Sequence, residues 1–173
     1  MIITKRLILR EWKKDDLIPF SIMNADPRVM EFFPAPLSKK ESDAMVKKIQ
    51  KEMSEKGYGL WALEVQENEQ FIGFVGIHHV TFPAYFTPCI EIGWRLAYDS
   101  WGKGYATEAA KAVIDYAFNT LHLKELVSFT AKLNKRSIRL MERLGMTYDG
   151  DFEHPNLPDG HNLKSHVLYR HLG

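Results

Sequence analysis

Two glycines separated by one residue, Gly102 and Gly104, lie between a strand-like segment and an alanine-rich helical segment. Because glycine has no side chain, peptide amides in such a turn can approach a ligand closely, and the first turn of the helix offers further unpaired amides. The pattern predicts a loop that binds a phosphate or pyrophosphate. The helix macrodipole contributes only about 0.3–1 kcal/mol, whereas each amide hydrogen bond to a charged oxygen contributes about 1.5–3 kcal/mol. We therefore expect the amides to do most of the binding.

Two common phosphate motifs do not match this segment. A P-loop requires Gly-Lys followed by Ser or Thr, but Lys103 is followed by Gly104. A dinucleotide fingerprint requires Gly or Ala where Thr107 stands, and an acidic residue at the end of the next strand, where residues 129–131 are Phe-Thr-Ala. The alternative to an anion site is a plain tight turn from strand to helix.

The loop sequence Trp101-Gly-Lys-Gly-Tyr-Ala106 resembles the pyrophosphate-binding loop of the GNAT superfamily of acetyl-CoA-dependent N-acetyltransferases. Asn134-Lys-Arg-Ser137, followed by Leu144-Gly-Met146, is similar to the second cofactor element of that family. Thr4-x-Arg6-Leu-x-Leu-Arg10 resembles the start of its ribosomal-protein-alanine acetyltransferase branch. The similarity covers nearly the whole chain. Trp101 replaces the usual Gln or Arg, which removes one polar contact and leaves the amides of the loop in place.

The resemblance implies acetyl-CoA as co-substrate and no metal. It also implies that the diphosphate lies on the amides of the loop, that pantetheine follows the end of the preceding strand, and that Asn134 hydrogen-bonds the pantetheine arm. Backbone amides at the same strand end would stabilise the oxyanion of the attacked thioester. The cofactor-binding residues that follow from the resemblance are Trp94, Arg95, Leu96, Trp101, Gly102, Lys103, Gly104, Tyr105, Ala106 and Asn134.

An attacking amine must first lose a proton. A lysine amine with a pKa of about 10.4 is neutral roughly once in a thousand at neutral pH, whereas an α-amine with a pKa near 7.8 needs less help. The resemblance implies Glu91 as the general base, and burial would raise the pKa of its carboxyl toward the useful range. The alternative is a strand glutamate that faces solvent or pairs with an arginine. Glu153, His79 and His154 are the other candidates for the base.

The departing thiolate needs a proton or a hydrogen bond. The resemblance implies Ser137 in this role, and the alternative is a hydroxyl that caps the helix start. Tyr169 is a second candidate. Cys89, the only cysteine, is expected to be a small buried hydrophobe rather than an acyl carrier. Adjacent strand residues point to opposite faces, so His78 and His79 cannot form a paired metal site.

The elements that must position these residues follow from periodicity and capping signals. Ser38-Lys-Lys-Glu41 is a capping box that starts a helix ending at Gly57, Gly145 ends another helix, and Asp15 or Asp16 can cap the first one. The order β-α-α-β-β-β-α-β-α-β-β predicts an α/β (α+β) fold, in which a GNAT-like mixed, largely antiparallel sheet of about seven strands has helices on both faces. We expect strands at 7–12, 60–65, 71–78, 89–96, 126–131, 146–152 and 163–169, and helices at 15–24, 38–57, 105–121 and 135–144.

Length and composition indicate one globular domain over residues 1–173, with a net charge of +1, 26% charged and 45% hydrophobic residues. The near-neutral charge argues against a nucleic-acid partner. A single cysteine excludes an intramolecular disulfide and is compatible with a reducing cytoplasm. No apolar run approaches the roughly 18 residues that cross a bilayer, so we expect a cytoplasmic protein with no membrane partner.

These observations favour transfer of an acetyl group from acetyl-CoA to a primary amine by direct attack on the thioester. The acceptor is either a protein N-terminus or a small molecule such as an amino acid, a polyamine or an aminoglycoside. A non-catalytic module that binds and senses acyl-CoA is the alternative function. The aromatic segment at residues 82–86 is a substrate wall, a homodimer contact or a plug of the core.

Overall fold

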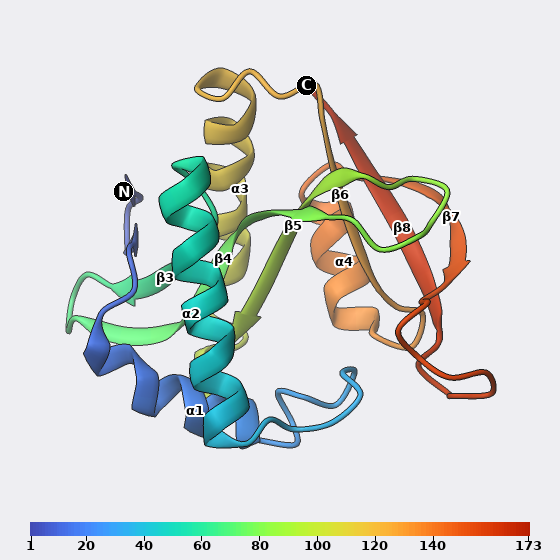
Figure 1. The fold of residues 1–173 in the computed structure, drawn as a ribbon. Coiled ribbons are helices and arrows are strands. Elements are labelled where there is room, and N and C mark those ends of the chain that lie inside the picture. Colours follow the sequence, from blue (N-terminus) through green and yellow to red (C-terminus); the bar gives the residue numbers. More distant parts are fainter.

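The computed structural model describes all 173 residues and is built around one eight-stranded sheet (Figure 1). Every strand pairing is antiparallel except the parallel contact between β5 and β6. In spatial order the strands are β1 (Ile2–Ile3), β2 (Leu7–Arg10), β3 (Leu60–Val65), β4 (Gln70–Val80), β5 (Cys89–Leu96), β6 (Glu125–Ala131), β8 (Ser165–Leu172) and β7 (Thr147–Glu153). The predicted mixed sheet is confirmed. The strand that was not predicted is β1, which is too short to show a sequence period.

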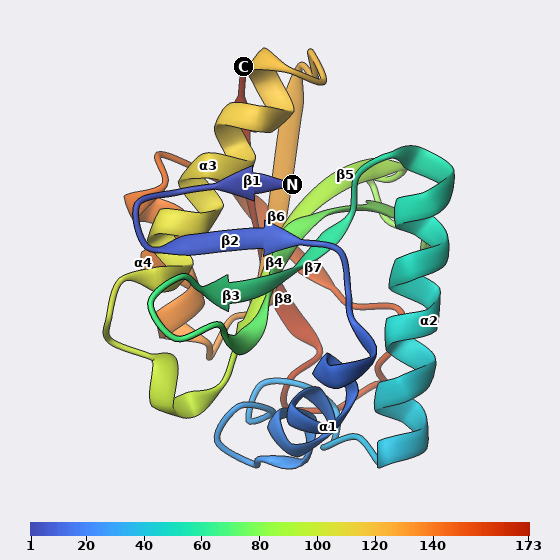
Figure 2. The same cartoon turned by 90° about the vertical axis from the view of Figure 1, so that its left-hand side faces the viewer.

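The sheet is covered on both faces, as predicted. The helices are α1 (Leu17–Ala25), α2 (Lys39–Lys56), α3 (Tyr105–Asn119) and α4 (Lys135–Arg143). Figure 2 shows α2 and α3 on opposite sides of the sheet. The residues of β3 alternate accordingly: Leu60 and Ala62 pack in the cluster that includes α1 and α2, whereas Trp61 and Leu63 pack with α3 and α4.

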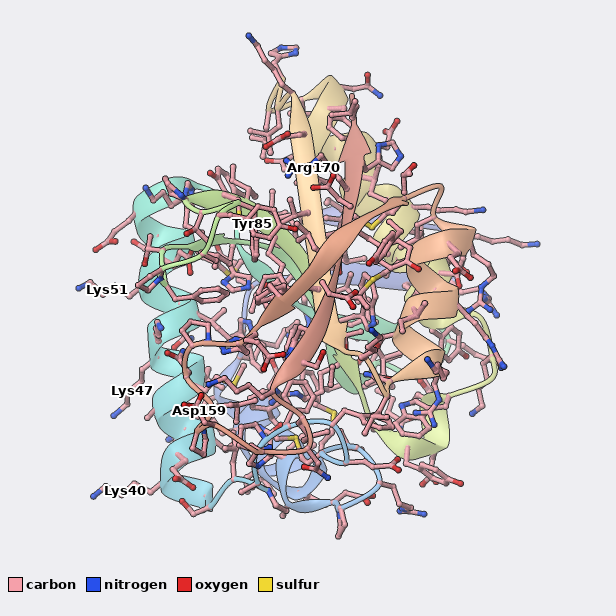
Figure 3. The ribbon with its side chains drawn as sticks, turned by 90° about the vertical axis from the view of Figure 1, so that its right-hand side faces the viewer. Lys40, Lys47, Lys51, Tyr85, Asp159 and Arg170 are labelled. Carbon is pink, nitrogen blue, oxygen red and sulfur yellow. The ribbon has the colours of Figure 1, made fainter.

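Local capping signals set the helix ends. The amide of Ser38 donates to Glu41 Oε2 at 2.7 Å, and the amide of Glu41 donates to Ser38 Oγ at 3.2 Å, which confirms the capping box at the start of α2. Gly57 ends that helix in the left-handed conformation at φ 77°, and Gly145 follows α4 at φ 79°. Figure 3 shows Lys40, Lys47 and Lys51 pointing outward from α2, so this side of the helix faces solvent.

Asp16, one of the two predicted alternatives, stands at the N-cap position of α1, but the prediction that its side chain caps this helix is wrong. A 3₁₀ turn, η1 (Lys14–Asp16), precedes the helix, and the Asp16 side chain makes no capping hydrogen bond to it. Its carboxylate instead receives two bonds from the buried guanidinium of Arg10, at 2.7 and 2.9 Å, while Glu64 receives a third at 2.6 Å. A buried arginine needs carboxylate partners more strongly than a helix start needs one cap, so the tertiary ion cluster overrides the local signal.

The sheet opens between β5 and β6. These two strands share a single ladder pair, Glu91 with Val127, and then diverge toward their carboxyl ends (Figure 1). Each of the two strands stays paired with its other neighbour to its carboxyl end. The β4–β5 ladder includes Gly73 with Leu96, and the β6–β8 ladder includes Ala131 with His166. The opening therefore lies directly beyond Glu91, at the strand ends that lead into the glycine loop. None of the helices has the length and apolar character that a membrane span requires.

Candidate functional site

A cavity of about 930 Å³ occupies the opening between β5 and β6. Thr107 and Ser137 line it from the side of α3 and α4, and Met45 and Phe74 line it from the side of α1 and α2. The cavity thus connects the two faces of the sheet. Among the predicted site residues it is lined by Glu91, Trp94, Arg95, Leu96, Trp101, Gly102, Gly104, Tyr105, Ala106, Asn134 and Ser137. Lys103 does not line it, and its carbonyl accepts a bond from Arg6 Nη1 at 2.9 Å.

The glycine loop presents its backbone to this cavity. Gly102 and Gly104 have φ values of 73° and 78°, a left-handed conformation that other residues adopt at a cost. The backbone amides from 102 to 107 donate to no protein acceptor, and the first amide of α3 with a partner is that of Glu108, bonded to the Gly104 carbonyl at 3.0 Å. A row of unpaired amides at a helix start is a site for an anion.

The N-terminal segment holds this loop in place. Arg6 Nε donates to Glu108 Oε2 at 2.7 Å, and Thr4 donates to the other oxygen of the same carboxylate at 2.7 Å. Burial acts to raise the pKa of Glu108, but the hydrogen bonds from Thr4 and Arg6 outweigh it and lower the pKa. Trp101, which replaces the family's polar residue, donates from its indole Nε1 to the Leu96 carbonyl at 2.9 Å and so ties the loop to β5.

Two arginines next to the loop were not predicted from the sequence. Arg136 and Arg143 line the cavity, and neither forms an ion pair within the chain. The guanidinium carbon of Arg136 lies 3.7 Å from the ring centroid of Trp101. Their spacing of seven residues places both on one side of α4, and this helical period was the sequence signal that could have identified them.

Ser137 has a hydroxyl whose own hydrogen is unused. Its Oγ accepts a bond from Trp94 Nε1 at 3.3 Å and another from Asn134 Nδ2 at 3.1 Å, and it donates to no protein acceptor. The cap of α4 is Asn134, whose Oδ1 accepts from the Ser137 amide at 3.3 Å, so the alternative role of the Ser137 hydroxyl as the helix cap is wrong. A hydroxyl that accepts two bonds has its hydrogen free for a ligand in the cavity.

Glu91 pairs with His78, its partner across the β4–β5 ladder. The distance from Glu91 Oε2 to His78 Nε2 is 2.8 Å, and both residues line the cavity. Burial opposes protonation of the imidazole, but the hydrogen bond and charge of Glu91 outweigh it and raise the pKa of His78. Glu91 therefore neither faces open solvent nor pairs with an arginine. His79, named from the sequence, points away and contacts the Tyr58 hydroxyl at 2.8 Å, so it lies outside the cavity.

Most of the other candidates for proton transfer lie elsewhere. Glu153, Tyr169 and Cys89 do not line the cavity. Burial raises the pKa of the Cys89 thiol to about 11, as expected for an unreactive cysteine. His154 does line the cavity, and burial together with the charge of His166 lowers the pKa of His154 to about 4, which keeps its ring neutral at physiological pH.

The aromatic segment at residues 82–86 plugs a small core beside the site. The Phe82 ring centroid lies 5.6 Å from that of Phe129, and the Phe86 centroid lies 4.8 Å from that of Phe152. None of the residues from 82 to 86 lines the cavity, so the interpretation as a substrate wall is wrong. Tyr85 is the exposed aromatic residue of the segment, labelled in Figure 3.

Comparison with known proteins identifies the family. A family model described as the acetyltransferase (GNAT) domain matches residues 6–147. The chain belongs to the GNAT acetyltransferase family. This GNAT acetyltransferase is 34% identical to YkkB of Bacillus subtilis over 160 residues, which are 91% of each chain. A solved GNAT-family acetyltransferase from Bacillus anthracis shares its fold with a TM-score of 0.82 at 24% identity, covering 99% of this chain and 97% of that one. This chain is also 33% identical, over 88 residues, to a protein named spermidine N(1)-acetyltransferase from Escherichia coli K12. That match covers 51% of this chain and 44% of the Escherichia coli protein.

The family confirms the enzyme class expected from the sequence. This GNAT acetyltransferase is an acetyl-CoA-dependent N-acetyltransferase, which moves an acetyl group from acetyl-CoA to an amine. The unpaired amides of residues 102–107 and the two unpaired arginines of α4 fit the negative charges of coenzyme A.

Proposed function

We propose that the protein binds the diphosphate of acetyl-CoA on the amides of residues 102–106, with Arg136 and Arg143 beside it, and acetylates a small primary amine that enters from the opposite face of the sheet. The observation that carries this proposal is the row of unpaired amides facing a cavity that runs through the sheet. Pantetheine then follows β5 past Trp94 and Asn134 toward the opening. The thioester supplies an activated acyl group, so no covalent acyl-enzyme is required.

Glu91 is the general base in this proposal. Its Oε2 is bonded to His78, whereas its Oε1 has no partner in the protein and is free to accept the proton of an incoming amine. The hydrogen bond from His78 fixes the rotamer of Glu91. The backbone amides near Trp94 to Leu96 supply the donors for the developing oxyanion, as the family resemblance implies.

Ser137 stabilises the leaving thiolate. Trp94 and Asn134 together occupy the acceptor sites of its hydroxyl, so the hydroxyl hydrogen has no protein acceptor and is available to a ligand in the cavity. Asn134 is itself held by Thr130, with Nδ2 donating to Oγ1 at 3.0 Å, which makes the arrangement rigid. Ser137 lies on the side of α3 and α4, whereas Glu91 projects from β5 toward the face of α1 and α2. The base and the acid therefore act from opposite sides of the opening.

The charges of the cavity favour a small acceptor that is not a polycation. A polyamine, which the name of the Escherichia coli relative would suggest, needs acidic residues along its length. Glu91 is the only carboxylate that lines the cavity, and it is already paired with His78. Besides Glu91 and the phenol of Tyr105, the charged or ionisable residues on its wall are basic, namely Arg28, His78, Arg95, Arg136, Arg143, His154 and His166. The resemblance to the ribosomal-protein branch keeps a protein N-terminus as the alternative acceptor.

The test of this proposal measures ligand binding and turnover separately. Coenzyme A should raise the unfolding temperature of the native protein, and Gly104→Val should abolish that shift, because a β-branched side chain is strained at φ 78° and its Cβ would lie 3.5 Å from Nη2 of Arg6, which holds the loop. Gly57→Val is the matched control, because Gly57 has a φ of 77° and lies at the far end of α2. A Gly104→Val protein that keeps the full shift would overturn the loop assignment. Release of free coenzyme A thiol in the presence of amines then tests turnover, and its absence with every amine would favour the sensing module.

A further inference from the structure

Arg95 is a buried cation on the acceptor side of the cavity. It lies on β5 between Trp94 and Leu96, but its side chain projects to the opposite face, toward α1 and α2. Its Nη1 donates to Asn24 Oδ1 at 2.8 Å, and its guanidinium carbon lies 4.2 Å from the ring centroid of Phe33. Only 9% of Arg95 is exposed, and it lines the cavity. The predicted role of Arg95 in cofactor binding is thereby limited to its backbone.

This guanidinium has no carboxylate partner. It takes part in no ion pair, its Nε is buried with no hydrogen-bond partner, and its Nη2 donates to no protein acceptor. Arg10 gives the contrast within the same molecule, because it is equally buried at 8% exposed and is paired with both Asp16 and Glu64. Burial lowers the pKa of Arg95 to about 10, which still leaves it charged at neutral pH. A buried charge without a partner is costly, and a ligand that supplies the opposite charge relieves that cost.

The surrounding side chains position the guanidinium without neutralising it. Asn24 is fully buried and is fixed by its own bond from Nδ2 to Ser42 Oγ at 2.9 Å. The neutral Oδ1 of Asn24 therefore fixes Nη1 of Arg95 without neutralising the charge of the guanidinium. On the other edge Nε is buried and closed to a ligand, whereas Nη2 has no protein partner and is the donor that a carboxylate in the cavity can reach.

The charge count favours a singly charged anion. Arg28 also lines the cavity, but its Nη2 is bonded to Asp26 at 2.7 Å. Arg95 is thus the one unpaired arginine on the side of α1 and α2, which matches a carboxylate better than a doubly charged phosphate. Glu91 projects from the same face of β5, four residues away and roughly 13 Å along the strand at about 3.3 Å per residue. A molecule that reaches both side chains can offer an amine to Glu91 and an anion to Arg95, and the separation of the two strand positions favours an acceptor whose amine and carboxylate are several bonds apart.

Resting on the acetyl transfer proposed above, we propose that Arg95 binds a carboxylate of the acceptor, so that the acceptor is an amino acid or a similar small amine with a carboxylate. The site thus selects its substrate with a cation at one end and a base at the other. A polyamine or an uncharged amine would leave the Arg95 edge unpaired.

The test uses acceptor pairs that differ only in charge. Thiol release is measured with glycine, β-alanine, 4-aminobutyrate and a panel of L-amino acids, each beside its carboxamide. The native enzyme should prefer the acids by about tenfold or more in kcat/KM, and Arg95→Gln should remove that preference mainly through KM. The carboxamide of an α-amino acid has the less basic amine and needs less help from a base, so a preference for the acid cannot arise from amine basicity. Arg28→Gln is the matched control, and it should keep the preference.

The possible negative results lead to different conclusions. If the native enzyme acetylates the amides as fast as the acids, or prefers aminoalkyl phosphates, the carboxylate assignment is overturned while the proposed acetyl transfer stands. If no amine of either kind releases thiol, the proposed function itself fails. Should Arg95→Gln not fold, Arg95→Lys keeps the charge and should retain part of the preference. Thermal stabilisation of the native protein by N-acetyl amino acids, compared with their amides, tests the site without turnover, and equal shifts would contradict it.

Discussion

The indole Nε1 of Trp94 donates a hydrogen bond to the hydroxyl oxygen of Ser137 at 3.3 Å. This bond joins β5, which carries the oxyanion donors of the proposed mechanism, to the first turn of α4. With the bond from Asn134 it leaves the hydroxyl only its hydrogen to offer. The position of the proposed acid is therefore fixed by two elements that approach each other only where the sheet opens.

Removal of the Ser137 hydroxyl should slow turnover without loss of cofactor binding. Ser137→Ala is expected to lower kcat by about tenfold to a hundredfold, because the leaving thiolate loses its hydrogen-bond donor. Steady-state kinetics and the thermal shift with coenzyme A separate the two effects. Trp94→Phe keeps the ring and removes the donor, so a smaller decrease of the same kind should follow. An unchanged kcat in Ser137→Ala would exclude the serine as the acid.

Loss of the base should depend on the acceptor. Glu91→Gln keeps the size of the side chain and is expected to lower kcat by roughly 10²–10⁴, with the larger decrease for acceptors of higher amine pKa. The measurement is kcat against pH for a weakly and a strongly basic amine. At each pH the variant should fall further behind the native enzyme with the strongly basic amine than with the weakly basic one. Equal activity of the two proteins across the pH range would remove Glu91 from the mechanism.

The His78–Glu91 pair predicts a pH-dependent contribution to folding stability. The pKa of His78 is raised in the folded state above its ordinary value of 6.5, so its extra stabilisation is fully present below pH 6.5 and is lost as the pH rises through the raised pKa. Urea unfolding at about pH 5.5 and about pH 8.5 should show His78→Asn destabilised more at the lower pH, by about 1 kcal/mol.

Glu91→Gln tests the same pair from the side of the carboxylate, again by urea unfolding at the two pH values. Because the same interaction is removed from the other partner, the variant should lose the same pH-dependent part of the free energy of unfolding, and the double variant should lose little more. Additive losses in the double variant would show that the two side chains do not stabilise each other.

The parts of this fold that sequence reasoning predicted correctly are those decided by neighbouring residues. The capping box of Ser38 and Glu41, and the left-handed stop at Gly57, depend on backbone groups only a few residues away. The unpaired amides around Gly102 and Gly104 are likewise a local consequence of a turn into a helix. The predicted strands 60–65 and 89–96 coincide with β3 and β5 for the same reason.

The parts that sequence reasoning missed depend on strand register and on tertiary charge. His78 meets Glu91 only because the β4–β5 ladder places them opposite each other, and no local pattern gives that register. The isolation of Arg95 among Asn24 and aromatic rings is equally invisible in the sequence. Asp16 looked like a cap because it stands just before a helix, and no local pattern shows that the guanidinium of Arg10 on β2 takes its carboxylate.

The two arginines of α4 should contribute to coenzyme A binding by charge. Arg136→Gln and Arg143→Gln are each expected to weaken binding by a few fold to about tenfold, because each removes a charge-assisted contact with a phosphate at a site that solvent partly screens. Calorimetric titration at low and high salt measures this, and the loss should be larger at low salt. Arg139→Gln is the matched control, since Arg139 lies on the same helix, is exposed and does not line the cavity. If all three variants lost affinity equally, the effect would come from the net charge of the helix rather than from a phosphate site formed by Arg136 and Arg143.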